Sequence, residues 1–421
     1  MRLKLTLLLL LIPLFLSAQD TLTLTTCLEE VVENSPRLRD KNLIDEQGQL
    51  TMDNIRTNWY PQLMLNGKAS YQSDVVSIEM SDPSLPFSFP DMPHEQFGLN
   101  LDVQQTIYDG GMSKQKRQYE QAITASEIQR VDVDIYGLKE QVTGIYFSVL
   151  VLQENRGNLE IAMKNLKARE EMLASAVANG IAMESDLNVL KVEVLKILQS
   201  FSELDAAKQG AIKMLSIFMG RDLTRHTILE QPYMELAPGD DIKRPELELF
   251  NLQSATLEAG KELASSKRLP LVYAYGQAGV GMPGYNMLND EVDSYYMVGA
   301  GLKWNIWDWN KTKREKQILE KRKLMIENSK ETFSMNIQAG MDREYENMEH
   351  FSNVLKLDDK MLEMRMDITK NAASKLDNGT ISATDYVLEL NEESLTRIKR
   401  STHKLQLMKA IANYNLLKGT L

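Results

Sequence analysis

Histidine and cysteine, which commonly perform catalysis or bind transition metals, are few in this chain, and their spacing forms no site. The four histidines, His94, His226, His350 and His403, are scattered, and none has a second ligand at the spacing of a zinc site. The chain also lacks a phosphate-binding loop and a nucleophile elbow. We therefore expect no enzyme activity, no cofactor and no resident metal.

Acidic side chains are more informative, because two of them recur in the same local setting. Asp186 and Asp385 lie 199 residues apart. Each follows a serine or threonine, Ser185 or Thr384, and this pairing suits the start of a helix, where carboxylates are favoured. Two interpretations are open: the aspartates are ordinary first-turn residues, or they act through their charge.

An Asn-Gly pair precedes each aspartate. Asn179 and Gly180 recur as Asn378 and Gly379, again 199 residues apart. Asparagine and glycine tolerate the left-handed backbone that reverses the chain between two helices. The sequence therefore predicts a tight turn between helices at both places.

Long apolar seams flank the first of these turns. Apolar residues spaced alternately three and four apart are typical of left-handed coiled coils. They predict a helical hairpin over residues 112–220, and the repeated pattern predicts a second over 311–419. The first seam comprises Ile128, Val131, Ile135, Leu138, Val142, Ile145, Val149, Leu152, Leu159, Met163, Leu166, Leu173 and Val177.

The whole chain is written twice. Tyr108 and Asp109 recur as Trp307 and Asp308, an offset of 199, whereas Pro61 recurs as Pro270, an offset of 209. Repeat 1 therefore spans residues 19–220 and repeat 2 spans 244–421. A linker at 221–243 joins them, and we expect this linker to lie at the equator, around the middle of the helical assembly. Each repeat opens with a helix, expected at Leu28 to about Asn58 and at Pro245 to Lys267.

Two strands are expected in each repeat, between its first helix and its hairpin. Polar and apolar residues alternate over about 61–73, 96–107 and 295–307, which marks strands with one apolar face. The fourth strand is expected at about 270–280, where the alternation is least clear. Long outer loops join them, and aromatic residues gather at their ends, as in transmembrane β-barrels. Four strands are too few to close a barrel, so several copies must pool their strands. The aromatic residues are Trp59, Tyr60, Tyr108, Trp304, Trp307 and Trp309.

Composition and the first residues indicate export. Residues 1–18 have a basic start at Arg2 and Lys4, an apolar run and a small-residue end at Ala18, as in a secretory signal peptide. The net charge of −11, without a basic run, argues against a nucleic-acid partner. Cys27 is the only cysteine, so the chain forms no internal disulfide.

Taken in order, these segments resemble the TolC-type outer-membrane efflux proteins. The first copy reads YPQLMLNGKASY, VQQTIYDGG, NGIAMESDLNVL and LSIFMG, and the second reads LPLVYAYGQAGV, LKWNIWDWN, NGTISATDYVLEL and LLKG. The resemblance implies an α+β membrane protein: a homotrimer with a 12-strand barrel in the outer membrane and a periplasmic α-helical tunnel. Members are passive exit channels that an adaptor joins to an inner-membrane pump.

Carried over by position, the resemblance places both Asn-Gly turns at the periplasmic tip and implies that Asp186 and Asp385 ring a closed entrance. A second acidic ring of the family falls here on Leu388, and a latching basic residue falls on Ile381, so neither is carried over. The exposed apolar candidates near the turns, Ile181, Met183 and Ile381, are interpreted either as adaptor contacts or as packing between hairpins.

The sequence thus predicts an outer-membrane exit channel of a tripartite efflux or type I secretion system. Its partners would be outer-membrane lipid, a periplasmic adaptor (membrane fusion protein) and an inner-membrane pump, with no nucleic acid. The alternative from a different class is a soluble periplasmic coiled-coil scaffold or adaptor, in which the strands pack into a water-soluble domain.

Overall fold

The computed structural model describes residues 21–76, 92–239, 241–286 and 291–421. The predicted signal peptide, residues 1–18, lies outside the described residues. The chain divides into two compact units, which are described separately. The first comprises residues up to Arg39, Asp132–Pro245 and Phe333–Leu421, and the second comprises Asp40–Val131 and Glu246–Thr332.

Four long helices form two hairpins of equal dimensions. Helices α3 (Met112–Ala178) and α6 (Lys311–Asp377) each have 67 residues, and α4 (Glu184–Met219) and α7 (Ala383–Lys418) each have 36. The seam predicted on α3 faces the interior, since Val142, Val149 and Leu166 are fully buried. Among the described residues, no helix is both long and apolar enough to cross a membrane.

The helix expected at Leu28 to Asn58 is in fact two helices, α1 (Leu24–Asn34) and α2 (Pro36–Arg56). The break falls at Ser35, whose backbone is extended. Pro36 explains it, because proline has no N–H to continue the helix and disfavours helical dihedrals in the residue before it. A short 3₁₀ turn, η1 (Thr57–Trp59), follows α2.

The core of the first unit gathers α1, α3, α4 and α7. Two short strands, β1 (Thr21–Leu22) and β4 (Ile228–Leu229), pair in parallel beside it. Cys27 lies in this core, and burial raises the pKa of its thiol to about 12, so the thiol stays protonated and unreactive. The largest fully buried members are Tyr146, Phe147, Leu150, Ile212, Leu215, Met219 and Leu229.

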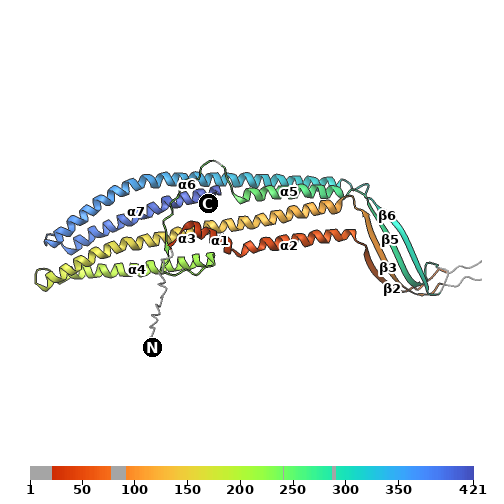
Figure 1. Cartoon of the computed structure of the whole chain (residues 1–421), viewed down its shortest axis with the longest axis horizontal. Coiled ribbons are helices and arrows are strands. Elements are labelled where there is room, and N and C mark those ends of the chain that lie inside the picture. The colour runs from red at the N-terminus through yellow and green to blue at the C-terminus, as the bar shows by residue number, and fades with distance from the viewer. Residues whose placement is uncertain (1–20, 77–91, 240, 287–290) are drawn as a thin grey trace, which may run out of the picture. The chain divides into compact units, whose positions relative to one another are not determined.

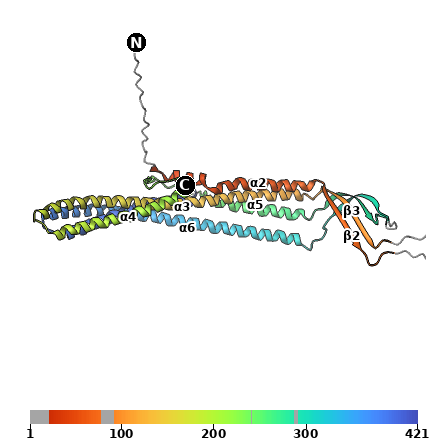
Figure 2. The ribbon, with the colours of Figure 1, turned by 90° about the horizontal axis from the view of Figure 1, so that it is seen from below.

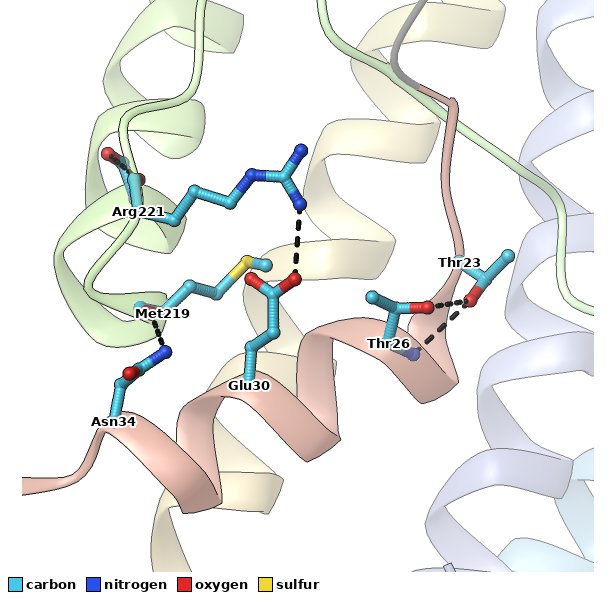
Figure 3. Close-up of polar contacts among 7 residues, drawn as sticks. Thr23, Thr26, Glu30, Asn34, Met219 and Arg221 are labelled. Carbon is cyan, nitrogen blue, oxygen red and sulfur yellow. Dashed lines mark hydrogen bonds and ion pairs between the residues drawn. The ribbon is translucent and has the colours of Figure 1, made fainter.

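Polar contacts fasten α1 to the end of α4 (Figure 3). The Asn34 side chain donates to the carbonyl of Met219 at 2.7 Å, and Arg221 forms an ion pair with Glu30 at 3.1 Å. At the start of α1, the Thr23 hydroxyl accepts the N–H of Thr26, which satisfies a helix donor that has no partner within the helix.

The linker at 221–243 is held by side chains of the long helices. The Tyr146 hydroxyl lies within hydrogen-bond distance of the carbonyls of Leu22 and Glu230, at 2.9 and 2.6 Å. Lys418 is buried at 1 % exposure, and its ammonium donates to the carbonyls of Ala237 and Pro238 and also to that of Gly239. Such a cage of carbonyl acceptors compensates for the loss of water around a buried charge.

In the second unit, α2 lies along the first part of α3 in both views (Figures 1 and 2), where Gly48 approaches Thr124 closely. Helix α5 (Pro245–Ser266) contacts α6 through ion pairs of Lys261 with Glu320 and of Lys323 with Glu258. These contacts hold α2 and α5 against the helices that follow the strands.

Four strands form one antiparallel sheet in the order β2-β3-β5-β6, with β2 and β6 at its edges (Figure 1). They are β2 (Gln62–Tyr71), β3 (Glu95–Tyr108), β5 (Leu271–Met282) and β6 (Asp293–Lys303). The strand expected at 295–307 stops at Lys303, opposite Leu271. Pro270 precedes Leu271 and has no N–H to offer, so the ladder ends there.

The two faces of the sheet differ sharply. On the polar face, the carboxylate of Asp102 accepts hydrogen bonds from Asn66, Asn100 and Gln277. On the other face, large apolar side chains are exposed on every strand. These are Leu63, Leu65, Phe97, Leu99, Leu101, Val280, Tyr296, Val298 and Leu302.

Candidate functional site

The candidate site is the pair of turns at the ends of the hairpins, which lie at one end of the first unit (Figures 1 and 2). We call residues 175–187 the first tip and residues 374–386 the second tip. Both adjoin one buried apolar cluster to which all four long helices contribute. Its members are Ala162, Met163, Leu166, Leu190, Val194, Ile197, Ala372, Ala373, Ala383, Tyr386, Val387 and Leu390.

The first tip ends α3 with a glycine in the left-handed conformation. Gly180 has φ +70°, and its N–H bonds to the carbonyl of Val177 at 2.9 Å. The N–H of Ile181 reaches back to Ala176, also at 2.9 Å. This pair of bonds is the Schellman motif, which satisfies helix carbonyls that have no partner within the helix.

The second tip repeats this geometry. Gly379 has φ +69°, and the N–H groups of Gly379 and Thr380 bond to the carbonyls of Leu376 and Lys375, each at 2.9 Å. Any side chain at either glycine would have to adopt the left-handed backbone, which is unfavourable for L-residues. The glycines therefore serve the turn in the way that their sequence setting suggests.

The asparagines have a different role from the glycines. Asn179 and Asn378 do not adopt the left-handed backbone, because neither has a positive φ. Instead, each side-chain amide donates to a carbonyl four residues earlier, Asn179 to Ser175 at 2.9 Å and Asn378 to Ser374 at 2.8 Å. They cap the carbonyl end of the outgoing helix.

The starts of the return helices differ. The second tip has a capping box, in which the Ser382 hydroxyl accepts the N–H of Asp385 and the Asp385 carboxylate accepts the N–H of Ser382. At the first tip the cap position holds Met183, which makes no side-chain cap bond. Ser185 and Thr384, expected to favour these helix starts, lie inside the first turn rather than at the cap.

The two aspartates consequently have different surroundings. Asp385 is exposed, and the pKa of its carboxyl is lowered because the hydroxyl and the N–H of Ser382 donate hydrogen bonds to the charged form. Asp186 is half-buried at the same position of α4. Among the described residues, the Asp186 carboxylate has no hydrogen-bonding or ionic partner that corresponds to Ser382.

An ion pair joins the two hairpins near the second tip. Arg169 of α3 bonds to Asp377, the last residue of α6, at 2.5 Å, and their side chains are 24 % and 28 % exposed. A carboxylate at the C-terminal end of a helix interacts unfavourably with the helix dipole. The charge of Arg169 offsets this repulsion at Asp377. Burial raises the pKa of the neighbouring Tyr386 phenol, and the positive charge of Arg169 opposes that rise.

The three apolar candidates also separate. Ile181 and Met183 of the first tip are 80 % and 72 % exposed. Ile381 of the second tip is half-buried and packs against the apolar cluster. Leu388, at the position of the family's second acidic ring, is exposed. The first tip thus presents apolar side chains to solvent, whereas the second covers its own.

Arg169 and Ser382 were not identified from the sequence. The Ser-x-x-Asp spacing of Ser382 and Asp385 is a capping-box pattern that the sequence displays. In contrast, Arg169 and Asp377 are 208 residues apart, and no local pattern joins them. In the described ranges, no three histidine, cysteine or acidic side chains are grouped to hold a metal ion. The arrangement offers fixed charge and turn geometry rather than bond-making groups.

Comparison with known proteins identifies the fold. The sequence matches no known family model and no curated protein. The structure is similar to the outer-membrane channel OprN, with TM-score 0.70 and 14 % identity over 94 % of this chain and 90 % of OprN.

Two further outer-membrane proteins show the same likeness. The CmeC channel of Campylobacter jejuni gives TM-score 0.66 and 13 % identity over 94 % of this chain and 85 % of CmeC. VceC of Vibrio cholerae gives 0.65 and 14 %, over 94 % and 95 % of the two chains. The resemblance to TolC-type proteins predicted from the sequence is confirmed at the level of fold.

Proposed function

We propose that this protein is an outer-membrane exit channel, which passively conducts substrate delivered by a periplasmic adaptor and an inner-membrane pump of a tripartite efflux or type I secretion system. The proposal starts from a chain with the fold of outer-membrane channels. The observation that carries it is the exposed apolar face of the four-stranded sheet.

That face suits lipid rather than water. Leu65 and Val298 are 70 % and 78 % exposed, and each of the four strands exposes at least one large apolar side chain on this face. Soluble proteins rarely expose a continuous apolar surface of this kind. In a bilayer the same face gains favourable contact with acyl chains, while the polar face around Asp102 lines an aqueous interior.

The sheet also needs partners at its edges. β2 and β6 are edge strands within the chain, and backbone groups without hydrogen-bond partners are not tolerated inside a bilayer. A barrel of four strands is too small to close. Three copies would supply the 12 strands that the family resemblance implies. We therefore assign the functional protein as a homotrimer with a periplasmic helical tunnel.

The two tips then form the pump-facing entrance. In a trimer, Asp186 and Asp385 would each occur three times around the opening, where rings of carboxylates attract cations into a narrow passage. Ile181 and Met183 are the assigned adaptor contacts, because they are exposed and apolar. Ile381 is the weaker of the three candidates, since it is occupied by packing against the cluster.

The alternative of a soluble periplasmic scaffold is less well supported. It shares the helical hairpins, but its strands would have to bury their apolar residues in a domain core. The exposure of these residues on all four strands argues against such a core.

Membrane fractionation tests the proposed function directly. The full chain should be recovered with outer membranes, resist extraction by salt and high pH, and dissolve only in detergent. As a matched pair, Val298→Asp on the apolar face should reduce recovery in the membrane, and Met297→Asp on the polar face should leave it unchanged. Recovery of the unaltered protein in the soluble periplasmic fraction would contradict the proposal.

A further inference from the structure

The two strand hairpins of the sheet are equivalent pair by pair. In β2–β3, Gln62 lies opposite Gln104, and in β5–β6, Leu271 lies opposite Lys303. The first pair becomes the second when β2 is shifted by 209 residues and β3 by 199, the offsets between the two halves of the sequence. The same two offsets turn each of the remaining β2–β3 pairs into a β5–β6 pair. The sequence offsets are therefore also structural equivalences.

A joint between the two hairpins exists inside the chain, where β3 pairs with β5. Leu101 lies opposite Ala278 there, and Gln104 lies opposite Tyr275. The strand equivalent to β3 is β6, and the strand equivalent to β5 is β2. These two strands are the free edges of the sheet (Figure 1), so the internal joint is a template for the joint between copies.

We propose that β6 of one protomer pairs with β2 of the next in the register that β3 and β5 use within the chain. Applying the offsets places Ala300 opposite Ala69 of the partner and Lys303 opposite Asn66 of the partner. This inference rests on the proposed function, because it requires the sheet to close between copies of the chain.

The faces of the strands support this register. Even-numbered residues of β2 and odd-numbered residues of β6 lie on the polar face. Met64 lies directly opposite Asp102, and Met297 lies opposite Gln277, which itself lies opposite Asp102. The inferred register joins even to odd numbers, so polar meets polar and apolar meets apolar. A slip of one residue would reverse every side chain of one strand. Slips by an even number of residues keep the faces matched, and the smallest of these is a slip of two.

Charge argues against one of these slips. A shift of two in one direction would place Lys303 opposite Lys68, and like charges directly opposite are destabilising. The inferred register instead places Lys68 opposite Gly301, which carries neither a charge nor a side chain. The opposite shift places Lys68 at Gly299 and brings no such repulsion, so experiment must separate it.

The polar face of β6 has two glycines opposite the inferred positions of partner residues. A Cβ at Gly301 or Gly299 would overlap the phenol group of Tyr273 or Tyr275, so both rings lie across β6 on the polar face. In the inferred register, Lys68 and Ser70 of the partner arrive opposite these two glycines. Their ammonium and hydroxyl groups can then donate to the phenol oxygens, which continues the polar layer from one protomer to the next.

The ends of the strands show the same relation. Inside the chain, Gly110 packs tightly against Leu269. The equivalents of these residues are Trp309 and Tyr60, and both are exposed in the single chain. Trp309 has a left-handed backbone like that of Gly110, with φ 54° against 66°. We assign Trp309 and Tyr60 of the partner to one contact beside the paired strands.

Disulfide trapping in the full chain tests the register. In a Cys27→Ala background, Ala69→Cys combined with Ala300→Cys should crosslink between protomers on oxidation in membranes and give dimer and trimer bands that a reductant removes. Neighbouring cysteines on antiparallel strands lie within the Cα separations that a disulfide requires. Asn66→Cys with Lys303→Cys provides a second in-register pair, in case ladder geometry disfavours the first.

The shifted controls are Ala300→Cys combined with Gly67→Cys or with Tyr71→Cys, each two residues out of register. We expect these to crosslink at least tenfold less than Ala69 with Ala300. Preferential trapping of a shifted pair would overturn the register alone. If no pair crosslinks while the protein remains an outer-membrane trimer, pairing of β6 with β2 is overturned. Recovery as a soluble monomer would instead contradict the proposed function.

Discussion

The two tips share one turn and adjoin one apolar cluster, but they differ in how the next helix begins and in their charged contacts. Both use an asparagine and a left-handed glycine to reverse the chain. At the second tip, a capping box fixes Asp385 and an ion pair fixes Asp377. At the first, Met183 leaves the helix start without a side-chain cap, and apolar side chains face solvent.

The two tips have the same backbone turn although the side chains around it differ. The residue equivalent to Asp377 is Ala178, and the residue equivalent to Arg169 is Ile368. The second tip is therefore bound to its neighbouring hairpin by charge, whereas the first tip lacks the corresponding groups. We therefore expect the second tip to be the more rigid of the two and the first tip to be the more adaptable.

The largest difference should come from removing the ion pair. Arg169→Ala takes away a charge-assisted hydrogen bond worth about 1.5–3 kcal/mol and leaves Asp377 opposing the dipole of α6. Hydrogen exchange at the second tip should accelerate by about 10- to 100-fold, while exchange at the first tip should change little.

Arg400→Ala is the matched control, because its ion pair with Asp359 is more exposed, at 38 % and 58 %. Exposed pairs contribute about 0–1 kcal/mol, so this variant should have a small effect. Equal acceleration in both variants would show that Arg169 has no special role at the tip.

A smaller effect should follow from exchanging the caps. Ser382→Ala should destabilise the first turn of α7 by about 1 kcal/mol, and Met183→Ser should stabilise the first turn of α4 by a similar amount. Local hydrogen exchange in detergent-solubilised protein measures both changes. Either single change should make the two helix starts more alike, and the two changes together should reverse the difference between the tips.

Ser185→Ala provides the control for the first tip, since this hydroxyl lies inside the helix rather than at the cap. If Met183→Ser leaves exchange of α4 unchanged, the absence of a cap does not explain the difference between the tips.

The backbone of the tips and the local capping pattern at Ser382 could be predicted from the sequence, whereas the contacts between hairpins could not. Asn-Gly at equal spacing specifies a helix reversal through local dihedral preferences. The pairing of Arg169 with Asp377 depends on how two hairpins distant in sequence pack together. The packing of Ile381 against the apolar cluster likewise requires the arrangement of all four long helices.

The sheet shows the same division. Alternation located three of the strands, and its position in the second repeat located the fourth, over 270–280. In the last strand the alternation continued through Trp304 to Ile306. The last strand nevertheless ends at Lys303, because the neighbouring strand has no backbone donor at Pro270. Alternation reports the two faces of a strand, but the partner strand decides where the strand ends. The break at Ser35 was in principle visible, since Pro36 follows it directly.

Conductance across planar bilayers tests the central claim most directly. The purified protein should form channels that prefer cations, and Asp186→Ala with Asp385→Ala should weaken both this preference and block by multivalent cations. Failure of the unaltered protein to conduct would contradict the channel, and an unchanged double variant would contradict the entrance assigned to the tips.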